Sequence, residues 1–207
     1  MRSERRWLGF AALGWALWYA VAVRAYAGVT GEFLGAGRVP AAWRDGFRTA
    51  NLTAAGIIAL GGLAALALCL PWPPWLRTGS LRAGRSRAEA GRLRTALLRL
   101  LRPVLAVGVG VGGLFAFLHG TAGLVLDSLE LGGGLSSGRR ADVVGLSAAE
   151  RADITRMYAA MHADHHDLLR WDVLFYEPWF LVMGILLILT AWRYRVDRAP
   201  GVVTTGV

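Results

Sequence analysis

The chain has 207 residues, 55% of which are hydrophobic, with a mean hydropathy of +0.44 and a formal charge of +9. This apolar content excludes an intrinsically disordered chain and is high for a soluble domain. The single cysteine, Cys69, excludes an intramolecular disulfide framework and a cysteine-rich metal site. All 23 basic residues are arginines, so the positive charge needs an explanation that is compatible with an apolar chain.

Four long blocks hold most of the apolar residues and almost no charge. A bilayer core about 30 Å thick needs about 20 helical residues, so each block is long enough to cross it. Helices also satisfy their own backbone hydrogen bonds in lipid. We therefore predict an all-α fold, a four-helix transmembrane bundle that forms one domain over residues 1–207. The expected spans are about 7–25, 52–72, 103–126 and 172–192.

The first block also has the outline of a secretory signal peptide. An arginine-rich start precedes the apolar stretch, and Ala25-Tyr26-Ala27 follows it as a small-residue cleavage site would. However, the apolar run is longer than the usual signal-peptide core, and Arg24 lies just before the cleavage position. We therefore expect a retained helix, with cleavage as the alternative.

The arginines predict the orientation of the bundle. With four spans, the N-terminus, the loop at 77–102 and the C-terminal tail lie on one side, and they hold 14 arginines against 3 acidic residues. The two loops on the other side hold 9 arginines and 10 acidic residues. We therefore expect both termini in the cytoplasm. Because arginine-only basicity with abundant Ala and Gly is typical of GC-rich bacterial genomes, the expected location is the bacterial cytoplasmic membrane.

Residues 89–102, EAGRLRTALLRLLR, place leucines on one side of a helix and arginines on the other. This pattern predicts a basic amphipathic helix on the cytoplasmic membrane surface, ending where Pro103 begins the third span. Its arginines would meet anionic headgroups, each contributing about 1 kcal/mol. The segment lacks the interleaved exposed aromatics of a nucleic-acid site, so nucleic acid is not expected as a partner.

Small residues recur every four positions in the third span, at Gly108, Gly112, Ala116 and Gly120. This spacing lines them up on one face and lets another helix approach closely. The bilayer is the expected environment, and a membrane-protein partner or a homo-oligomer is compatible with the pattern.

The segment between the third and fourth spans predicts a further helix on the outer side. Ser147 and Glu150 have the spacing of a capping box, which starts a helix. A stripe at helical spacing follows and extends toward the fourth span. We expect this amphipathic helix to lie against the outer surface or to cap the bundle. The stripe comprises Ile154, Met157, Tyr158, Met161, His165 and Leu168.

Three histidines, His162, His165 and His166, lie close together in that segment. His162 and His166 are four residues apart, and imidazoles at this helical spacing can chelate Zn or Cu. Ala163 stands where a metalloprotease would place its general base. We favour a solvated polar helix face, with no cofactor expected, and keep a metal site as the alternative.

His119 and Glu177 lie inside predicted spans, and Tyr19 lies about 7 Å below Arg24 at the helical rise. All three fall in the outer half of the bilayer. Ionisable groups there are costly, and they usually face the bundle interior or water. One hypothesis is a polar pocket in which His119 and Glu177 bind a ligand or act as acid and base. The other is a structural pair that joins the third and fourth spans.

The start of the last span resembles a known signature. Trp171-Asp172, then Tyr176, Pro178 and Leu181, fit W-D-x-x-x-Y-x-P-x-x-L, which resembles a family of small four-span bacterial membrane proteins of unknown function. The Trp- and Gly-bearing first span, at residues 14–19, is loosely similar to that family's first helix. The resemblance implies a compact four-helix membrane protein and adds no biochemistry.

These patterns favour a small polytopic membrane protein that acts as a binding or accessory protein with a polar pocket in the outer leaflet, rather than an enzyme. The first alternative is a membrane-embedded enzyme that acts on a lipid or isoprenoid substrate through His119 and Glu177. The second is a metal-handling protein that uses the outer histidines. We expect no nucleotide site, because the glycine-rich string at 108–113, which resembles a dinucleotide loop, follows no strand and lies inside a span.

Overall fold

The computed structural model describes residues 2–33, 37–70, 85–136, 145, 147–160 and 165–196. Within them, four helices are long and apolar enough to cross a membrane: Arg6–Thr30, Ala41–Cys69, Leu100–Leu131 and His165–Val196. The protein is therefore an all-α, multi-pass membrane protein, as predicted. All four helices extend beyond the predicted spans at one or both ends, because those ends carry polar residues that hydropathy alone does not count as membrane.

The first two spans form an antiparallel pair. Helix α1 (Arg2–Tyr19) continues through a π-helical turn, η1 (Ala20–Ala25), into α2 (Tyr26–Thr30). Gly31, with φ +71°, ends this helix in the left-handed region, which favours glycine. A short 3₁₀ turn, η2 (Ala41–Trp43), then leads into the second span, α3 (Arg44–Cys69). Before it, β1 (Glu32–Phe33) and β2 (Gly37–Arg38) form a small antiparallel hairpin that the sequence analysis did not predict.

The last two spans form the second antiparallel pair. Helix α5 (Arg85–Leu131) is followed by α7 (Ala148–Ala160) and α8 (His165–Trp171). A second π-helical turn, η3 (Asp172–Tyr176), joins α8 to α9 (Glu177–Val196). The capping box that starts α7 is confirmed, because the Ser147 backbone N–H donates to Glu150 at 2.8 Å and the Glu150 N–H donates to the Ser147 hydroxyl at 3.3 Å.

Glycines allow the helices of each pair to pack closely. In the first pair, a Cβ on Gly62 would lie 2.7 Å from the Ala16 Cβ. In the second pair, a Cβ on Gly113 would lie 2.9 Å from the Ile188 backbone nitrogen. Neither position has room for a larger side chain, so small residues set the distance between helices, as is common in membranes.

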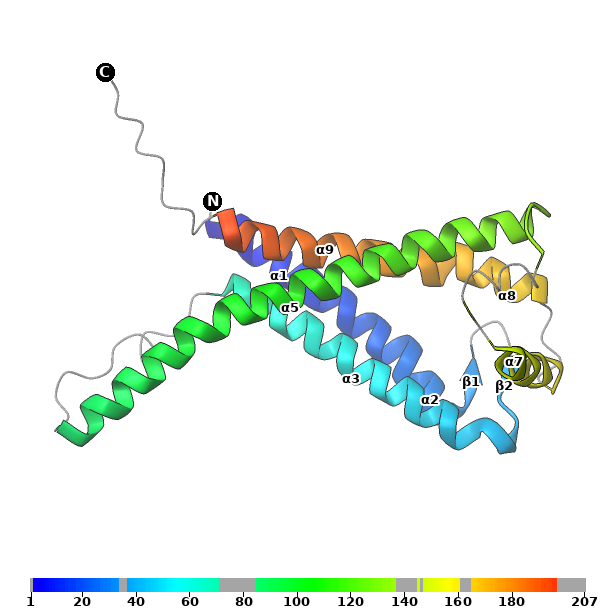
Figure 1. Cartoon of the computed structure of the whole chain (residues 1–207), viewed down its shortest axis with the longest axis horizontal. Helices are drawn as coiled ribbons and strands as arrows, with labels where there is room; N and C mark the ends of the chain where they lie inside the picture. Colours follow the sequence, from blue (N-terminus) through cyan, green and yellow to red (C-terminus); the bar gives the residue numbers. More distant parts are fainter. Residues whose placement is uncertain are drawn as a thin grey trace, which may run out of the picture.

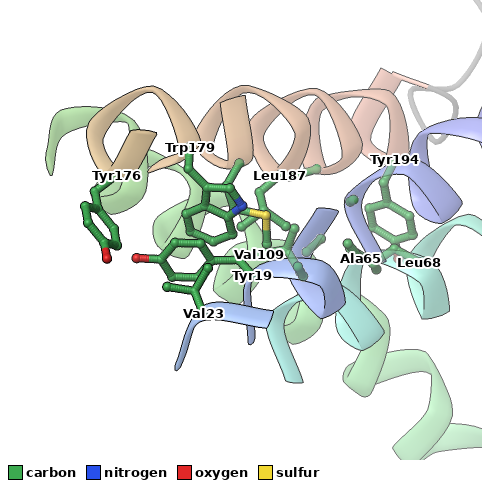
Figure 2. Close-up of a cluster of buried hydrophobic side chains, with 14 residues drawn as sticks. Tyr19, Val23, Ala65, Leu68, Val109, Tyr176, Trp179, Leu187 and Tyr194 are labelled. Atoms are coloured by element: carbon green, nitrogen blue, oxygen red, sulfur yellow. The ribbon is translucent and has the colours of Figure 1, made fainter. Parts of the chain in front are cut away.

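The two pairs meet at one end of the bundle and separate toward the other (Figure 1). We call the end where α1 starts and α9 ends the termini side, and the end that carries α7, α8 and the strands the loop side. Helix α1 packs on α9, and α3 contacts both α5 and α9. The apolar core lies along these contacts, from Tyr194 and Leu68 near the termini side to Tyr19 and Tyr176 toward the loop side (Figure 2).

Contrary to prediction, the basic helix does not end at Pro103. Pro103 lies inside α5, which runs as one helix of 47 residues, about 70 Å long. The proline removes one backbone hydrogen bond, which a membrane helix tolerates when neighbouring groups compensate. Its neighbour Arg102 also ties this part of α5 to the end of α3, by donating to the Leu70 carbonyl at 2.9 Å. The basic segment is thus continuous with the span.

The small-residue stripe of the third span is only partly where it was predicted. Ala116 is buried, and a Cβ on Gly120 would meet the Leu181 backbone nitrogen at 2.6 Å. Gly108 and Gly112 instead face open space, where an added Cβ would meet nothing within 4 Å. The face that packs on α9 follows a spacing of three and four residues rather than four alone, because that spacing keeps side chains on one side of a helix.

The segment predicted as one outer helix contains two helices, α7 and α8, that point in different directions. Figure 1 shows α7 end-on and α8 along its length, so the two do not share an axis. The predicted stripe from Ile154 to Leu168 is therefore not a single helix face. Leu168 is buried and Ile154 is exposed. The stripe residue Met161 lies outside the described residues.

Candidate functional site

Among the described residues, four of the five buried polar or charged side chains lie toward the loop side of the spans, and the fifth, Thr190, lies near the termini side. Asp127 is 0% exposed, Asn51 3%, and Glu130 and Glu177 8% each. A buried ionisable group in a membrane is costly, and it usually marks a polar interaction or a functional site. Of Asp127, Asn51, Glu130 and Glu177, only Glu177 was predicted from the sequence as a site residue.

An aromatic junction lies next to these residues, where α1 meets α9. The Tyr19 ring stacks on Trp179 with centroids 3.7 Å apart, and it meets Tyr176 edge-on at 6.3 Å. Figure 2 shows the Tyr19 hydroxyl on the side of Tyr176. The Trp15 indole N–H donates to the Trp179 carbonyl at 3.2 Å. These contacts join the two helix pairs on the loop side of their crossing.

Both π-helical turns flank this junction. Tyr19 is the last residue of α1 before η1, and Glu177 is the first residue of α9 after η3. A π-helical turn contains an extra residue and shifts the side chains that follow to another face. Such turns are rare and are frequent at functional sites. Each helix pair therefore contains one π-helical turn, and both turns adjoin the aromatic junction.

Arg24 lies within η1 and is half-buried. Its guanidinium donates to the Asn51 side-chain oxygen at 3.1 Å and lies 5.4 Å from the centre of the Tyr19 ring. Asn51 in turn donates to the Phe47 carbonyl at 2.9 Å, which fixes the amide. Arg24 is thus held in place by one helix of its own pair and by the aromatic junction.

Glu177 is buried within the second pair. Its carboxylate lies directly over Gly123 of α5, where even one added methyl group would overlap it. Glu177 also lies two residues before Trp179, on which the Tyr19 ring stacks at 3.7 Å. The structure therefore brings two of the predicted site residues, Tyr19 and Glu177, to the same junction.

His119, the third predicted residue, has different surroundings. It is exposed on the surface of α5. Its ring stacks beside Phe115 at 6.1 Å and meets Phe180 edge-on at 4.7 Å. Phe180 also meets Tyr19 edge-on at 5.8 Å. His119 thus lies at the edge of the junction, separated from Tyr19 by one aromatic ring.

Asp127 and Glu130 were missed, although the sequence contains a signal for both. The face of α5 that packs on α9 includes Gly113, Ala116, Gly120 and Gly123, spaced by three and four residues. The same spacing continues to Asp127 and Glu130. Side chains at these intervals share one face of a helix. Burial of the glycines therefore predicts burial of Asp127 and Glu130.

The outer histidines are only partly described. His162 lies outside the described residues, so the predicted pairing of His162 with His166 on one helix face stays a prediction. His165 and His166 are exposed at the start of α8, and His165 Nε2 lies 2.7 Å from Glu130 Oε1. Over the part of the chain that the structure describes, no group of three or more His, Cys, Asp or Glu residues could hold a metal ion.

Comparison with known proteins gives this site no precedent. No protein-family model, no curated protein and no solved structure matches the chain.

Proposed function

We propose that the protein is a binding or accessory protein that holds a ligand at the junction of its two helix pairs. The observation that carries this proposal is the position of the two π-helical turns. One comes from each pair. Arg24 lies within the first turn and Tyr176 within the second, and Tyr19 and Glu177 lie directly beside them. A purely structural contact between apolar helices needs neither irregular turns nor ionisable groups, because close packing of small residues supplies it.

The junction lies in the outer leaflet of a bacterial cytoplasmic membrane in this proposal. The support is the distribution of arginines, which places both termini and the loop at 77–102 in the cytoplasm. The loop side is then the outer side. The arginines of 85–102 would meet anionic headgroups at the inner surface. The family resemblance of the last span agrees with a small bacterial membrane protein.

Cysteine labelling tests the orientation. In a Cys69→Ala background, Ala152→Cys on the exposed surface of α7 should react with a membrane-impermeant maleimide on intact cells. Arg195→Cys, exposed near the end of α9, should react only after lysis. The reverse pattern would contradict the orientation.

Mass spectrometry of extracts from the purified protein tests the binding function. We expect a small molecule or lipid in stoichiometric amount with the wild-type protein and much less with Tyr19→Phe and Glu177→Gln. Trp192→Phe, at an exposed position near the termini side, is the matched control and should retain it. Equal retention by all four proteins, or no retained molecule, would contradict the proposal.

The acid–base alternative makes a different prediction for the same variants. If His119 and Glu177 carried out chemistry on a lipid, His119→Gln and Glu177→Gln would retain the bound molecule but stop its conversion. A binding role predicts that the wild-type protein leaves the molecule chemically unchanged.

A further inference from the structure

In the part of the chain that the structure describes, Arg24 is not paired with a carboxylate. Its partners are the Asn51 amide at 3.1 Å and the face of the Tyr19 ring at 5.4 Å. No carboxylate among the described residues lies within ion-pair distance of the guanidinium, whereas Arg38, Arg156 and Arg170 each have one. An arginine within a membrane span is costly, and it is usually paired or solvated.

The guanidinium is nevertheless held in a fixed orientation. It carries five N–H donors in a planar fork, and the hydrogen bond to Asn51 uses one of them. The Nε atom is buried and has no acceptor in the described part of the chain. The planar fork of a guanidinium fits a phosphate, which accepts two parallel hydrogen bonds.

The surroundings of Arg24 are those of an amphiphile rather than of a free ion. The helix pairs separate toward this side (Figure 1), and the exposed His119 of the opposite pair is linked to Tyr19 through the Phe180 ring. Next to His119, Phe115 and Leu118 are exposed and apolar.

We propose that Arg24 binds the phosphate of an outer-leaflet phospholipid, whose acyl chains lie along the apolar surface of α5 near Phe115 and Leu118. This inference rests on the proposed binding function and names its ligand class. Asn51 and Tyr19 position the guanidinium, and His119 faces the headgroup from the second pair.

Binding of dioleoyl-phosphatidylglycerol to the delipidated, detergent-solubilised protein tests this assignment, with native mass spectrometry as the readout. Arg24→Gln should weaken binding by about tenfold, as expected for loss of a charge-assisted hydrogen-bonded pair. Arg48→Gln removes an exposed arginine on the same side of the bundle and should change affinity by less than about twofold, as a solvated surface charge does. Unchanged binding by Arg24→Gln, or equal losses in both variants, would overturn the proposal.

Two further arms keep the test decisive. If Arg24→Gln does not fold, the wild-type protein must still prefer phosphatidylglycerol to dioleoylglycerol, which has the same chains and no phosphate, and equal binding overturns the proposal. Inorganic phosphate at millimolar concentration should not displace the lipid, and full displacement would assign a free-anion site instead. A co-purifying molecule that depends on Tyr19 and Glu177 but contains no phosphate would overturn this inference and leave the binding function standing.

Discussion

The two helix pairs use the same packing device and differ in the chemistry of their loop-side ends. In both, glycines bring the helices so close that an added methyl group would meet the neighbouring helix. The first pair then carries a cation, Arg24, bound to Asn51 of the same pair. The second carries carboxylates, with Glu177 over Gly123 and Glu130 beside His165.

This difference suggests how the site is assembled. Each pair holds its own polar groups, while the contacts between pairs near the junction are aromatic, chiefly Tyr19 on Trp179. Aromatic contacts fix geometry without neutralising charge. The cation of one pair and the carboxylates of the other therefore lie at the same junction, at the level where the pairs separate (Figure 1).

The largest expected effect is a packing change in the second pair. Gly113→Ala places a methyl group 2.9 Å from the Ile188 backbone nitrogen and 2.8 Å from the Leu187 Cβ. Since a backbone atom cannot rotate away, we expect a loss of about 3 kcal/mol in stability. Gly112→Ala, one residue earlier, meets nothing within 4 Å. Thermal unfolding in detergent should separate the two, and equal stabilities would contradict the α5–α9 packing.

The first pair offers the same comparison with a smaller effect. Gly62→Ala would place its methyl group 2.7 Å from the Ala16 Cβ, and we expect a loss of about 2 kcal/mol. Gly61→Ala has open space and should be neutral or slightly stabilising, because alanine favours a helix. If Gly61→Ala were the more harmful variant, α1 would pack on another face of α3.

A third change tests the burial of Glu177. Gly123→Ala overlaps its carboxylate, which is the end of a flexible side chain and can move. We expect a stability loss of about 1 kcal/mol, together with loss of the retained ligand. In a Glu177→Ala background the same change should cost nothing measurable. Additive losses in the double variant would show that the carboxylate lies elsewhere.

A smaller effect is expected where α8 meets α5. The His165–Glu130 contact joins an imidazole that is half exposed to a buried carboxylate. A double-mutant cycle with His165→Ala and Glu130→Gln should give a coupling of about 0.5 kcal/mol, since solvent screens the exposed partner. Amide hydrogen exchange at 165–171 should become faster in His165→Ala. Unchanged exchange would mean that this contact does not hold α8 on the second pair.

The smallest effect concerns the cap of α7, outside the spans. The Ser147 hydroxyl and backbone N–H donate to the Glu150 carboxylate and hold its pKa below the usual value. A lowered folded-state pKa means that the cap contributes stability above the pKa of the unfolded chain and loses it as pH falls through the folded-state pKa. An NMR titration should show the Glu150 pKa rising toward its ordinary value in Ser147→Ala. No change would contradict the cap.

The sequence predicted the spans because lipid requires long apolar helices, and it predicted the α7 cap because that motif is local. It did not predict that α5 continues through Pro103, since tertiary contacts such as Arg102 with Leu70 decide whether a proline ends a helix. The π-helical turns have no residue signature. Asp127 and Glu130 were within reach of sequence analysis, because their spacing continues that of the buried glycines on α5.

Of the predicted site residues, Tyr19 and Glu177 were found together because both lie at the start or end of a span helix next to an irregular turn. His119 was predicted to share their pocket from its depth alone. Depth along a helix does not specify which face a side chain occupies, and His119 lies on the exposed face beside Phe180. Arg24 was not predicted as a site residue, because the sequence does not show that its hydrogen-bond partner is the Asn51 amide.

The most direct test of the account is an electron cryo-microscopy structure of the wild-type protein in phosphatidylglycerol nanodiscs. The account predicts a phosphate within hydrogen-bond distance of the Arg24 guanidinium, between η1 and the surface of α5 that carries His119. A guanidinium paired instead with Asp172 or Glu177, with no ordered lipid at the junction, would contradict it.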